Sequence, residues 1–261
     1  MVCTRDGRHA YIGSNDGIIH MWDLENGKEI ARFKDHTKCI WDVALSSDEK
    51  LLASGGMDHV VRVWNASTAE LLARCEGHTD IVNAVVFAPN GAWLASAAYD
   101  GTVRLWKAAD GTELRRFQHG DNDVTPVEAV AISPDGRWVV SGGGQKHAQV
   151  WNVEEGSREG QYEIHDQVTL RNRETGEVKS WCIEENGIRF NATGDRVLSA
   201  GAKDKTIRIW NPRTGKVITR LQLDFDPWRF SISDDRRRLL ISGQDGVIHL
   251  WAIPQFATET P

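Results

Sequence analysis

The stretch GHTDIVNAVVFAPNGAWLASAAYDGTVRLW, residues 77–106, decides the fold of this chain. Residues 81–87 alternate and are rich in β-branched side chains, residues 88–91 read as a Pro-Asn-Gly turn, and residues 92–97 and 102–106 are two further apolar runs. Apolar runs of this length, separated by turn residues, are typical of antiparallel β-strands. A fourth run, ELLARC or ELRRFQ in successive copies, follows a turn such as AADGT. The stretch therefore predicts a small sheet of four antiparallel strands.

The same unit recurs along the chain. Tryptophans that end an alternating apolar run stand at intervals of 42, 42, 45, 59 and 41 residues, at Trp22, Trp64, Trp106, Trp151, Trp210 and Trp251. Six residues before them, in the turn that precedes the run, stand Asp16, Asp58, Asp100, Gln145, Asp204 and Asp245. A fixed offset between the same two residue types in five copies indicates six repeats of one structural unit.

Six such units define the expected fold class. Antiparallel strands without an amphipathic helix exclude a parallel β-α-β sheet and favour a propeller or a sandwich. The regular period selects an all-β propeller of about six four-stranded blades. We expect a single domain over residues 1–253 and a polar tail over 254–261, with repeats at about 1–36, 37–78, 79–120, 121–183, 184–224 and 225–253.

Composition and charge limit the classes of partner. The net charge of −6 and the absence of a long Lys/Arg cluster argue against a nucleic-acid backbone or an anionic membrane as partner. No apolar run reaches the length of about 20 residues that a membrane-spanning helix needs, and the first residues show no signal region. Four scattered cysteines form no zinc pattern and fit reduced thiols. We expect a protein or peptide partner and a cytoplasmic location.

The repeats resemble WD (WD40) repeats. The resemblance rests on the stretch quoted above and on GMDHVVRVWN (56–65), AKDKTIRIWN (202–211) and NDGIIHMWD (15–23), and it covers nearly the whole chain. It implies a rigid propeller that binds other proteins and is rarely catalytic. It also implies a hydrogen-bonded chain inside each blade, made by a loop histidine, a second-strand Ser or Thr, the turn aspartate and the third-strand tryptophan.

Ser96, His78 and Asp100 are also the residue types of a hydrolase triad. A nucleophile needs one accessible site, whereas the set occurs at equivalent positions in two repeats, so the structural interpretation is favoured. Complete sets are His36, Ser54, Asp58 and Trp64 in repeat two, and His78, Ser96, Asp100 and Trp106 in repeat three. Partial sets are Asp16 and Trp22, Asp204 and Trp210 with a doubtful His165, and Asp245 and Trp251.

The candidate partner-binding residues also follow from the resemblance. It places them at one position of the first strand and just before the turn aspartate, on a face of loops. Carried onto this sequence, they are Trp41, Asn83, Glu128, Asn186 and Trp228, and Asn15, Met57, Tyr99, Lys203 and Gln244. Large aromatic side chains dominate interface energies, which favours Trp41, Tyr99 and Trp228 as anchors. Packing over the sheet edge is the alternative for each tryptophan, and nearby acidic residues predict a basic partner segment.

Two departures from the repeat pattern bear on function. An insertion near residues 165–181 suggests an extra hairpin, and a neutral loop is the equally favoured alternative. Residues 1–10 already align with the end of a first strand, and residues 247–255 stop after a third strand. A spare outer strand is not visible, so we expect a piece of a longer protein or an incomplete ring, with self-association through unpaired edges.

Two functional classes stay open. The favoured one is a non-enzymatic interaction scaffold within a larger regulatory protein, with no cofactor and no metal. The alternative is a propeller hydrolase or lactonase, which needs histidines and carboxylates that converge on a channel. The repeat explains the loop histidines, and His20, His59, His147 and His249 fall at unrelated places near third strands.

Overall fold

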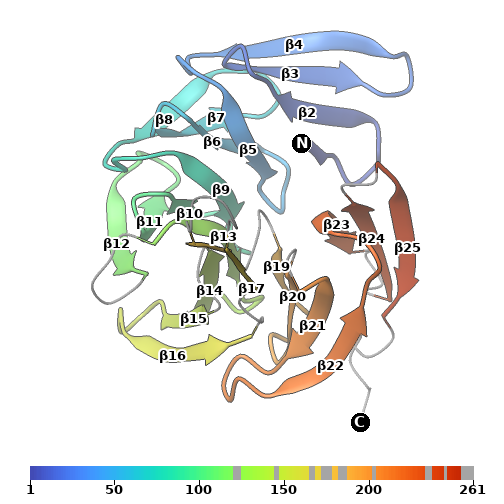
Figure 1. The fold of residues 1–261 in the computed structure, drawn as a ribbon. Coiled ribbons are helices and arrows are strands. Elements are labelled where there is room, and N and C mark those ends of the chain that lie inside the picture. The colour runs from blue at the N-terminus through green and yellow to red at the C-terminus, as the bar shows by residue number, and fades with distance from the viewer. Residues whose placement is uncertain are drawn as a thin grey trace. The chain divides into compact units, whose positions relative to one another are not determined.

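The computed structural model describes residues 1–119, 125–143, 147–164, 168–171, 178–181, 187–201, 204–232, 237–243 and 246–253, with only the backbone at 168–171, 178–181, 228 and 229. The chain divides into two compact units, Met1–Val127 and Glu128–Pro261. Unit 1 runs from blue to green in Figure 1, and unit 2 runs from green to red.

Unit 1 consists of three four-stranded antiparallel sheets, in which neighbours in sequence are neighbours in the sheet (Figure 1). Blade one contains β1 (Val2–Cys3), β2 (His9–Gly13), β3 (Ile18–Asp23) and β4 (Lys28–Lys34). Blade two contains β5 (Ile40–Leu45), β6 (Leu51–Gly56), β7 (Val61–Asn65) and β8 (Leu71–Cys75). Blade three contains β9 (Val82–Phe87), β10 (Trp93–Ala98), β11 (Thr102–Lys107) and β12 (Glu113–Gln118).

Unit 2 repeats this plan. Blade four contains β13 (Val127–Ile132), β14 (Trp138–Gly143), β15 (His147–Asn152) and β16 (Arg158–Glu163). Blade five contains β19 (Ile188–Phe190), β20 (Val197–Gly201), β21 (Thr206–Trp210) and β22 (Val217–Gln222). Blade six contains β23 (Pro227–Ile232), β24 (Arg238–Gly243) and β25 (Ile248–Ala252). These sheets confirm the predicted fold class, an all-β propeller of six blades.

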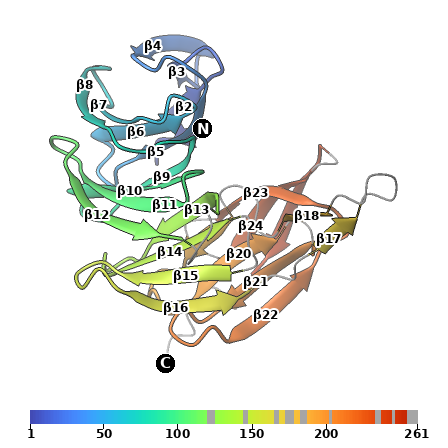
Figure 2. The ribbon, with the colours of Figure 1, turned by 60° about the vertical axis from the view of Figure 1, so that its left-hand side comes forward.

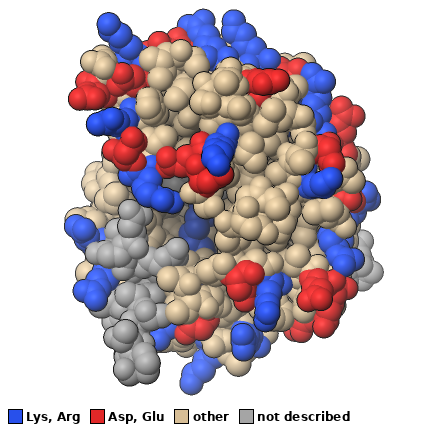
Figure 3. All heavy atoms as spheres, turned by 180° about the vertical axis from the view of Figure 1, so that it is seen from behind, with Lys and Arg blue, Asp and Glu red and all other residues tan. Residues whose placement is uncertain are grey.

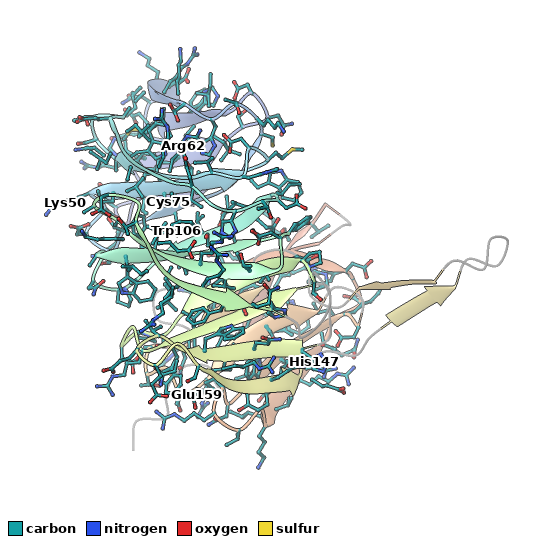
Figure 4. The ribbon with its side chains drawn as sticks, turned by 90° about the vertical axis from the view of Figure 1, so that its left-hand side faces the viewer. Lys50, Arg62, Cys75, Trp106, His147 and Glu159 are labelled. Atoms are coloured by element: carbon teal, nitrogen blue, oxygen red, sulfur yellow. The ribbon has the colours of Figure 1, made fainter. Side chains whose placement is uncertain are left out.

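The insertion forms a hairpin of its own. Strand β17 (Val168–Arg171) pairs with β18 (Val178–Trp181), with Thr169 opposite Ser180 and Leu170 opposite Lys179. The pair is a separate two-stranded sheet and stands away from the four-stranded sheets of its unit (Figures 2 and 4). The predicted hairpin is therefore present.

The blade tryptophans form the centre of the packing. Trp64, Trp106 and Trp210 are at most 1% exposed, because each side chain lies between its own sheet and a neighbouring one. In unit 1, Phe33 from the outer strand of blade one meets the Trp64 ring edge-on at 5.8 Å. In unit 2, Tyr162 from the outer strand of blade four meets Trp210 in the same way at 6.1 Å. The outer strand of one blade thus covers the tryptophan of the next.

The first and last strands lie where the sequence predicts them. Strand β1 has the first-strand position of blade one, and β25 has the third-strand position of blade six. In blades two to five the third strand is mostly buried, whereas Ile248 and Leu250 of β25 are 72% and 64% exposed. Within the described residues, β25 is the edge of its sheet.

Candidate functional site

In blade three, four side chains form one buried hydrogen-bonded chain. The indole N–H of Trp106 donates to Ser96 Oγ at 2.7 Å, and Ser96 Oγ lies 2.7 Å from Nε2 of His78. The other ring nitrogen, Nδ1, lies 2.8 Å from the Asp100 carboxylate. The consistent assignment has Trp106 donating to Ser96, Ser96 to His78, and His78 to Asp100.

Blade two contains the same hydrogen-bonded chain, with each distance within 0.2 Å of that in blade three. Trp64 Nε1 donates to Ser54 Oγ at 2.9 Å, and Ser54 Oγ lies 2.7 Å from His36 Nε2. His36 Nδ1 lies 2.9 Å from both carboxylate oxygens of Asp58. Both loops are closed further by a backbone N–H, from Thr37 to Asp58 and from Thr79 to Asp100, each at 3.1 Å.

The electrostatics of these chains fit a structural role. Burial lowers the pKa of His78 and of His36 and outweighs the adjacent carboxylates, so both imidazoles are neutral at neutral pH. Burial raises the pKa of Asp100, but hydrogen bonds from His78, Thr102 and Thr79 outweigh it and hold this pKa well below the usual range. Ser54 and Ser96 are 0% exposed, so neither hydroxyl can meet a substrate.

An arginine four residues after the turn aspartate completes the site, and the sequence reasoning missed it. In blade two, Arg62 donates to Asp58 at 2.9 Å and to Asp35 at 2.5 Å. In blade three, Arg104 lies 3.6 Å from Asp100 and donates to Glu113 at 2.7 Å. The signal was present in the sequence as Asp-x-x-x-Arg in three repeats. These buried arginines balance the charge of the turn aspartate.

Blades four and five contain parts of the hydrogen-bonded Trp-Ser-His-Asp chain. Trp151 Nε1 donates to Ser141 Oγ at 2.9 Å, and Trp210 Nε1 donates to Ser199 Oγ at 3.1 Å. Asp204 accepts from Thr206 Oγ1 at 2.7 Å and from Arg208 at 2.9 Å. Arg208 also donates to the carbonyl of Ile164. Gln145 and His165 lie outside the described residues.

Blade one differs from the prediction that Asp16 and Trp22 belong to such a chain. The Asp16 side chain is 49% exposed, and it accepts from the Ile18 N–H and lies 3.3 Å from His20 Nε2. Ile12 occupies the second-strand position that Ser54 and Ser96 have in the complete blades, so the half-buried Trp22 has no hydroxyl beside it.

Blade six differs in the same way. Ile241, which is 0% exposed, occupies the serine position, and Trp251 is half-buried. His249 stacks on Phe225 with 3.7 Å between ring centroids. Asp245 lies outside the described residues, so its predicted role stays a prediction.

Two predicted partner-binding residues of unit 1 lie together. The rings of Trp41 in β5 and Tyr99 after β10 meet edge-on, with centroids 6.1 Å apart, and both side chains are half-buried. Met57, 36% exposed, donates its N–H to the carbonyl of Cys39. The Cys39 thiol donates to Asn15 Oδ1 at 2.9 Å. We call Asn15, Cys39, Trp41, Met57 and Tyr99 the loop face of unit 1.

The predicted first-strand positions are related by backbone geometry. In β5 the pairing shifts between Ile40 and Asp42, which leaves Trp41 as a bulged residue. Asn83 in β9 and Trp228 in β23 occupy the same bulged place in their strands. A bulge turns its side chain away from the regular alternation, and bulges are frequent beside functional sites.

The other predicted residues differ in exposure. Asn83 is 1% exposed, and its contact with a partner stays a prediction. Glu128 in β13 is half-buried, and only the backbone of Trp228 is described. Asn186, Lys203 and Gln244 lie outside the described residues. Partner contacts by these residues stay predictions, and the loop face of unit 1 contains the predicted Asn15, Trp41, Met57 and Tyr99.

The described residues show neither a metal-ligand cluster nor a membrane-spanning helix. Within the described ranges, no three His, Cys, Asp or Glu side chains gather as metal ligands. No helix in that part of the chain is long and apolar enough to cross a membrane. On the face in Figure 3, described acidic and basic side chains are interspersed.

Repeated four-stranded blades with a buried Trp-Ser-His-Asp chain define a class, the β-propellers built from WD repeats. The family model described as WD domain, G-beta repeat (WD40) matches residues 27–65, 69–107, 111–152 and 172–211, more than half of the chain. The chain therefore belongs to the WD40 family. WD40 propellers typically mediate protein–protein interactions and are generally non-enzymatic.

Proposed function

We propose that this protein is a non-enzymatic scaffold that binds a protein or peptide partner through the loop face of unit 1. The observation that carries the proposal is the pair of Trp41 and Tyr99, which come from adjacent blades and meet at 6.1 Å. The role that WD40 propellers typically have supports it. A module of a larger regulatory protein is the setting that we propose.

The physical case rests on rigidity. Tyr99 directly precedes Asp100, which the buried chain of blade three holds, and its N–H donates to the carbonyl of Ile81. Met57 directly precedes Asp58 and is fixed in the same way in blade two. Aromatic anchors held in place before binding lose little entropy when a partner docks. Tyr99 and Trp41 therefore have the properties of an interface hot spot.

We also propose that the partner segment is basic. The net charge of −6 favours this, as does the exposed Asp80, which directly precedes Ile81 under Tyr99. A Lys or Arg side chain gains from an aromatic face and from a nearby carboxylate together. Capture that weakens as the salt concentration rises is the expected signature.

The test is affinity capture with the double variant Trp41→Ala/Tyr99→Ala. We expect loss of the captured partner with a far-ultraviolet spectrum and a melting transition close to wild type. Trp93→Ala is the matched control, because Trp93 is also half-buried but lies at the start of β10, outside the loop face. If the double variant unfolds, Met57→Lys is used instead: it places a positive charge on an exposed turn residue and should weaken capture of a basic segment. Full capture by folded variants would overturn the proposal.

A further inference from the structure

Unit 2 contains a cavity between blades four and five. Its volume is about 370 Å³, near the lower end of the range for small-ligand pockets. Trp138, Tyr162, Val150 and Pro212 supply its apolar wall, and Glu159 and Arg213 supply one charge of each sign. Figure 4 places Glu159 and His147 at opposite ends of the sheet of blade four. All lining residues belong to unit 2, so this cavity is distinct from the loop face of unit 1.

The aromatic wall is already formed without a ligand. Tyr162 donates its hydroxyl to the carbonyl of Arg213 at 2.8 Å and meets Trp210 edge-on. A Cβ added to Gly160 or to Gly215 would lie 2.4 Å or 2.2 Å from the Tyr162 ring. The two glycines therefore make the space in which the ring is held. A preformed wall of this kind is typical of binding pockets.

The residues that line this cavity differ from those at the equivalent positions of the other blades. The outer strands of blades one, two, three and five carry an exposed aliphatic residue at the position of Glu159, namely Ile30, Leu72, Leu114 and Ile218. Three residues after the blade tryptophan, where blade five has Arg213, earlier repeats have Glu25, Ser67, Ala109 and Glu154. Glu159 thus departs from an aliphatic pattern, whereas the position of Arg213 varies between repeats and is basic only in blade five; both residues line one cavity.

These two charges are available to a ligand. Glu159 accepts a hydrogen bond from Ser157 Oγ at 2.8 Å, and the described part of unit 2 offers its carboxylate no ion-pair partner. The Arg213 guanidinium has no ion-pair partner among the described residues, although its backbone N–H donates to Asn211. Arginine binds carboxylates through two parallel hydrogen bonds, and a carboxylate binds an ammonium group.

From this charge complementarity we propose that the cavity binds a free amino acid with an aromatic or branched aliphatic side chain. The side chain lies against Trp138 and Tyr162, the carboxylate faces Arg213, and the ammonium group faces Glu159. A cavity of about 370 Å³ suits one residue rather than a peptide segment. The proposal is independent of the proposed partner binding by unit 1.

The test is titration of the whole protein with L-phenylalanine and L-leucine, followed by calorimetry and by the amide signals of Gly160, Gly194 and Gly215. We expect saturable binding with shifts at these glycines. Glu159→Gln and Arg213→Gln should each weaken binding, roughly two- to tenfold, because each removes one charge-assisted contact at an exposed rim. Glu155→Gln and Lys216→Gln are matched controls, since they remove like charges from the neighbouring turns but do not line the cavity.

Capped probes distinguish a free amino acid from a peptide segment as the ligand. N-acetyl-phenylalanine amide has the ring without either charge and should not bind. The capped tripeptide acetyl-Lys-Phe-Asp-amide carries both charges on side chains. If it binds and free phenylalanine does not, a peptide segment is the ligand and the amino-acid proposal is overturned. Absence of binding by every probe, or equal binding by the charge variants and wild type, overturns it as well.

Discussion

Blades one and three both belong to unit 1 and have the same strand order, but the buried side chains inside the two blades differ. In blade three Trp106 is 0% exposed and donates to Ser96, and the Asp100 side chain is 4% exposed. In blade one Trp22 is half-buried and Asp16 is 49% exposed. Both sheets nevertheless have four strands in the same order. The strand pattern alone is therefore sufficient to form a blade. The buried hydrogen-bonded chain additionally fixes the tryptophan side chain and the loop in one position.

The largest effect is expected for Asp100→Ala. The Asp100 carboxylate accepts from His78, from the Thr79 and Thr102 backbone and from Thr102 Oγ1, and it faces Arg104. Its loss leaves several donors of the blade without their acceptor and leaves Arg104 with Glu113 as its remaining carboxylate, which costs about 3 kcal/mol. Chemical denaturation of unit 1 signals measures this change.

Asp16→Ala is the control that sharpens the comparison. Asp16 has the same place in its repeat but is solvent-exposed, so its replacement should leave the denaturation midpoint nearly unchanged. Equal losses of unfolding free energy for the two variants would show that the exposed and the buried aspartate stabilise their blades equally, which would contradict the contrast between the blades.

The next effect is expected for the serines. Ser96 bridges Trp106 and His78, so Ser96→Ala leaves two buried polar groups without a partner and should cost about 2 kcal/mol. Among the described residues Ser141 accepts only from Trp151, so Ser141→Ala should cost about 1 kcal/mol. Denaturation midpoints compare the two variants. A larger loss for Ser141→Ala would contradict the bridging role of Ser96.

The hydrogen-bonded chains show which parts of the structure can be predicted from the sequence. The Trp and Asp spacing predicted the blades, because strand length and turn position repeat in the sequence itself. Family resemblance predicted the members of the chain in blades two and three. It was misleading for blade one, since Ile12 replaces the serine and removes the acceptor for the indole N–H. Blade one has neither this serine nor a loop histidine before its first strand in the sequence, and yet the strand pattern persists.

The candidate surface was harder to predict. First-strand bulges place Trp41 beside Tyr99 but bury Asn83, and a bulge leaves no mark in strand periodicity. The arginine partners of the turn aspartates were visible only as a spacing of four residues. The cavity in unit 2 depends on two residues of β16, Glu159 and Tyr162, which look like ordinary surface substitutions until blade five is placed beside them.

A smaller effect is expected for the coupling between Asp100 and Arg104. Repeat four replaces both members of this pair, with Gln145 and Gln149, rather than one. A double-mutant cycle with Asp100→Gln and Arg104→Gln should therefore give a coupling of about 1 kcal/mol, with the double variant more stable than the sum of the singles predicts. Additive losses would show that the two side chains, 3.6 Å apart, do not stabilise each other.

The smallest effect concerns pH. Burial holds the pKa of His36 and His78 below the ordinary value of 6.5, so the unfolded chain binds protons that the folded blades do not. The stability contributed by the neutral histidines is therefore present above about pH 6.5 and is lost as the pH falls below it. The midpoint of thermal unfolding should decrease between about pH 7.5 and pH 5.5, and His78→Gln should reduce the slope. A midpoint that stays constant over this window would show that folding leaves these two pKa values unshifted and would contradict the prediction. A midpoint that rises as the pH falls would place charged imidazoles inside the blades and reverse the hydrogen-bond assignment, with Nε2 donating to the serine.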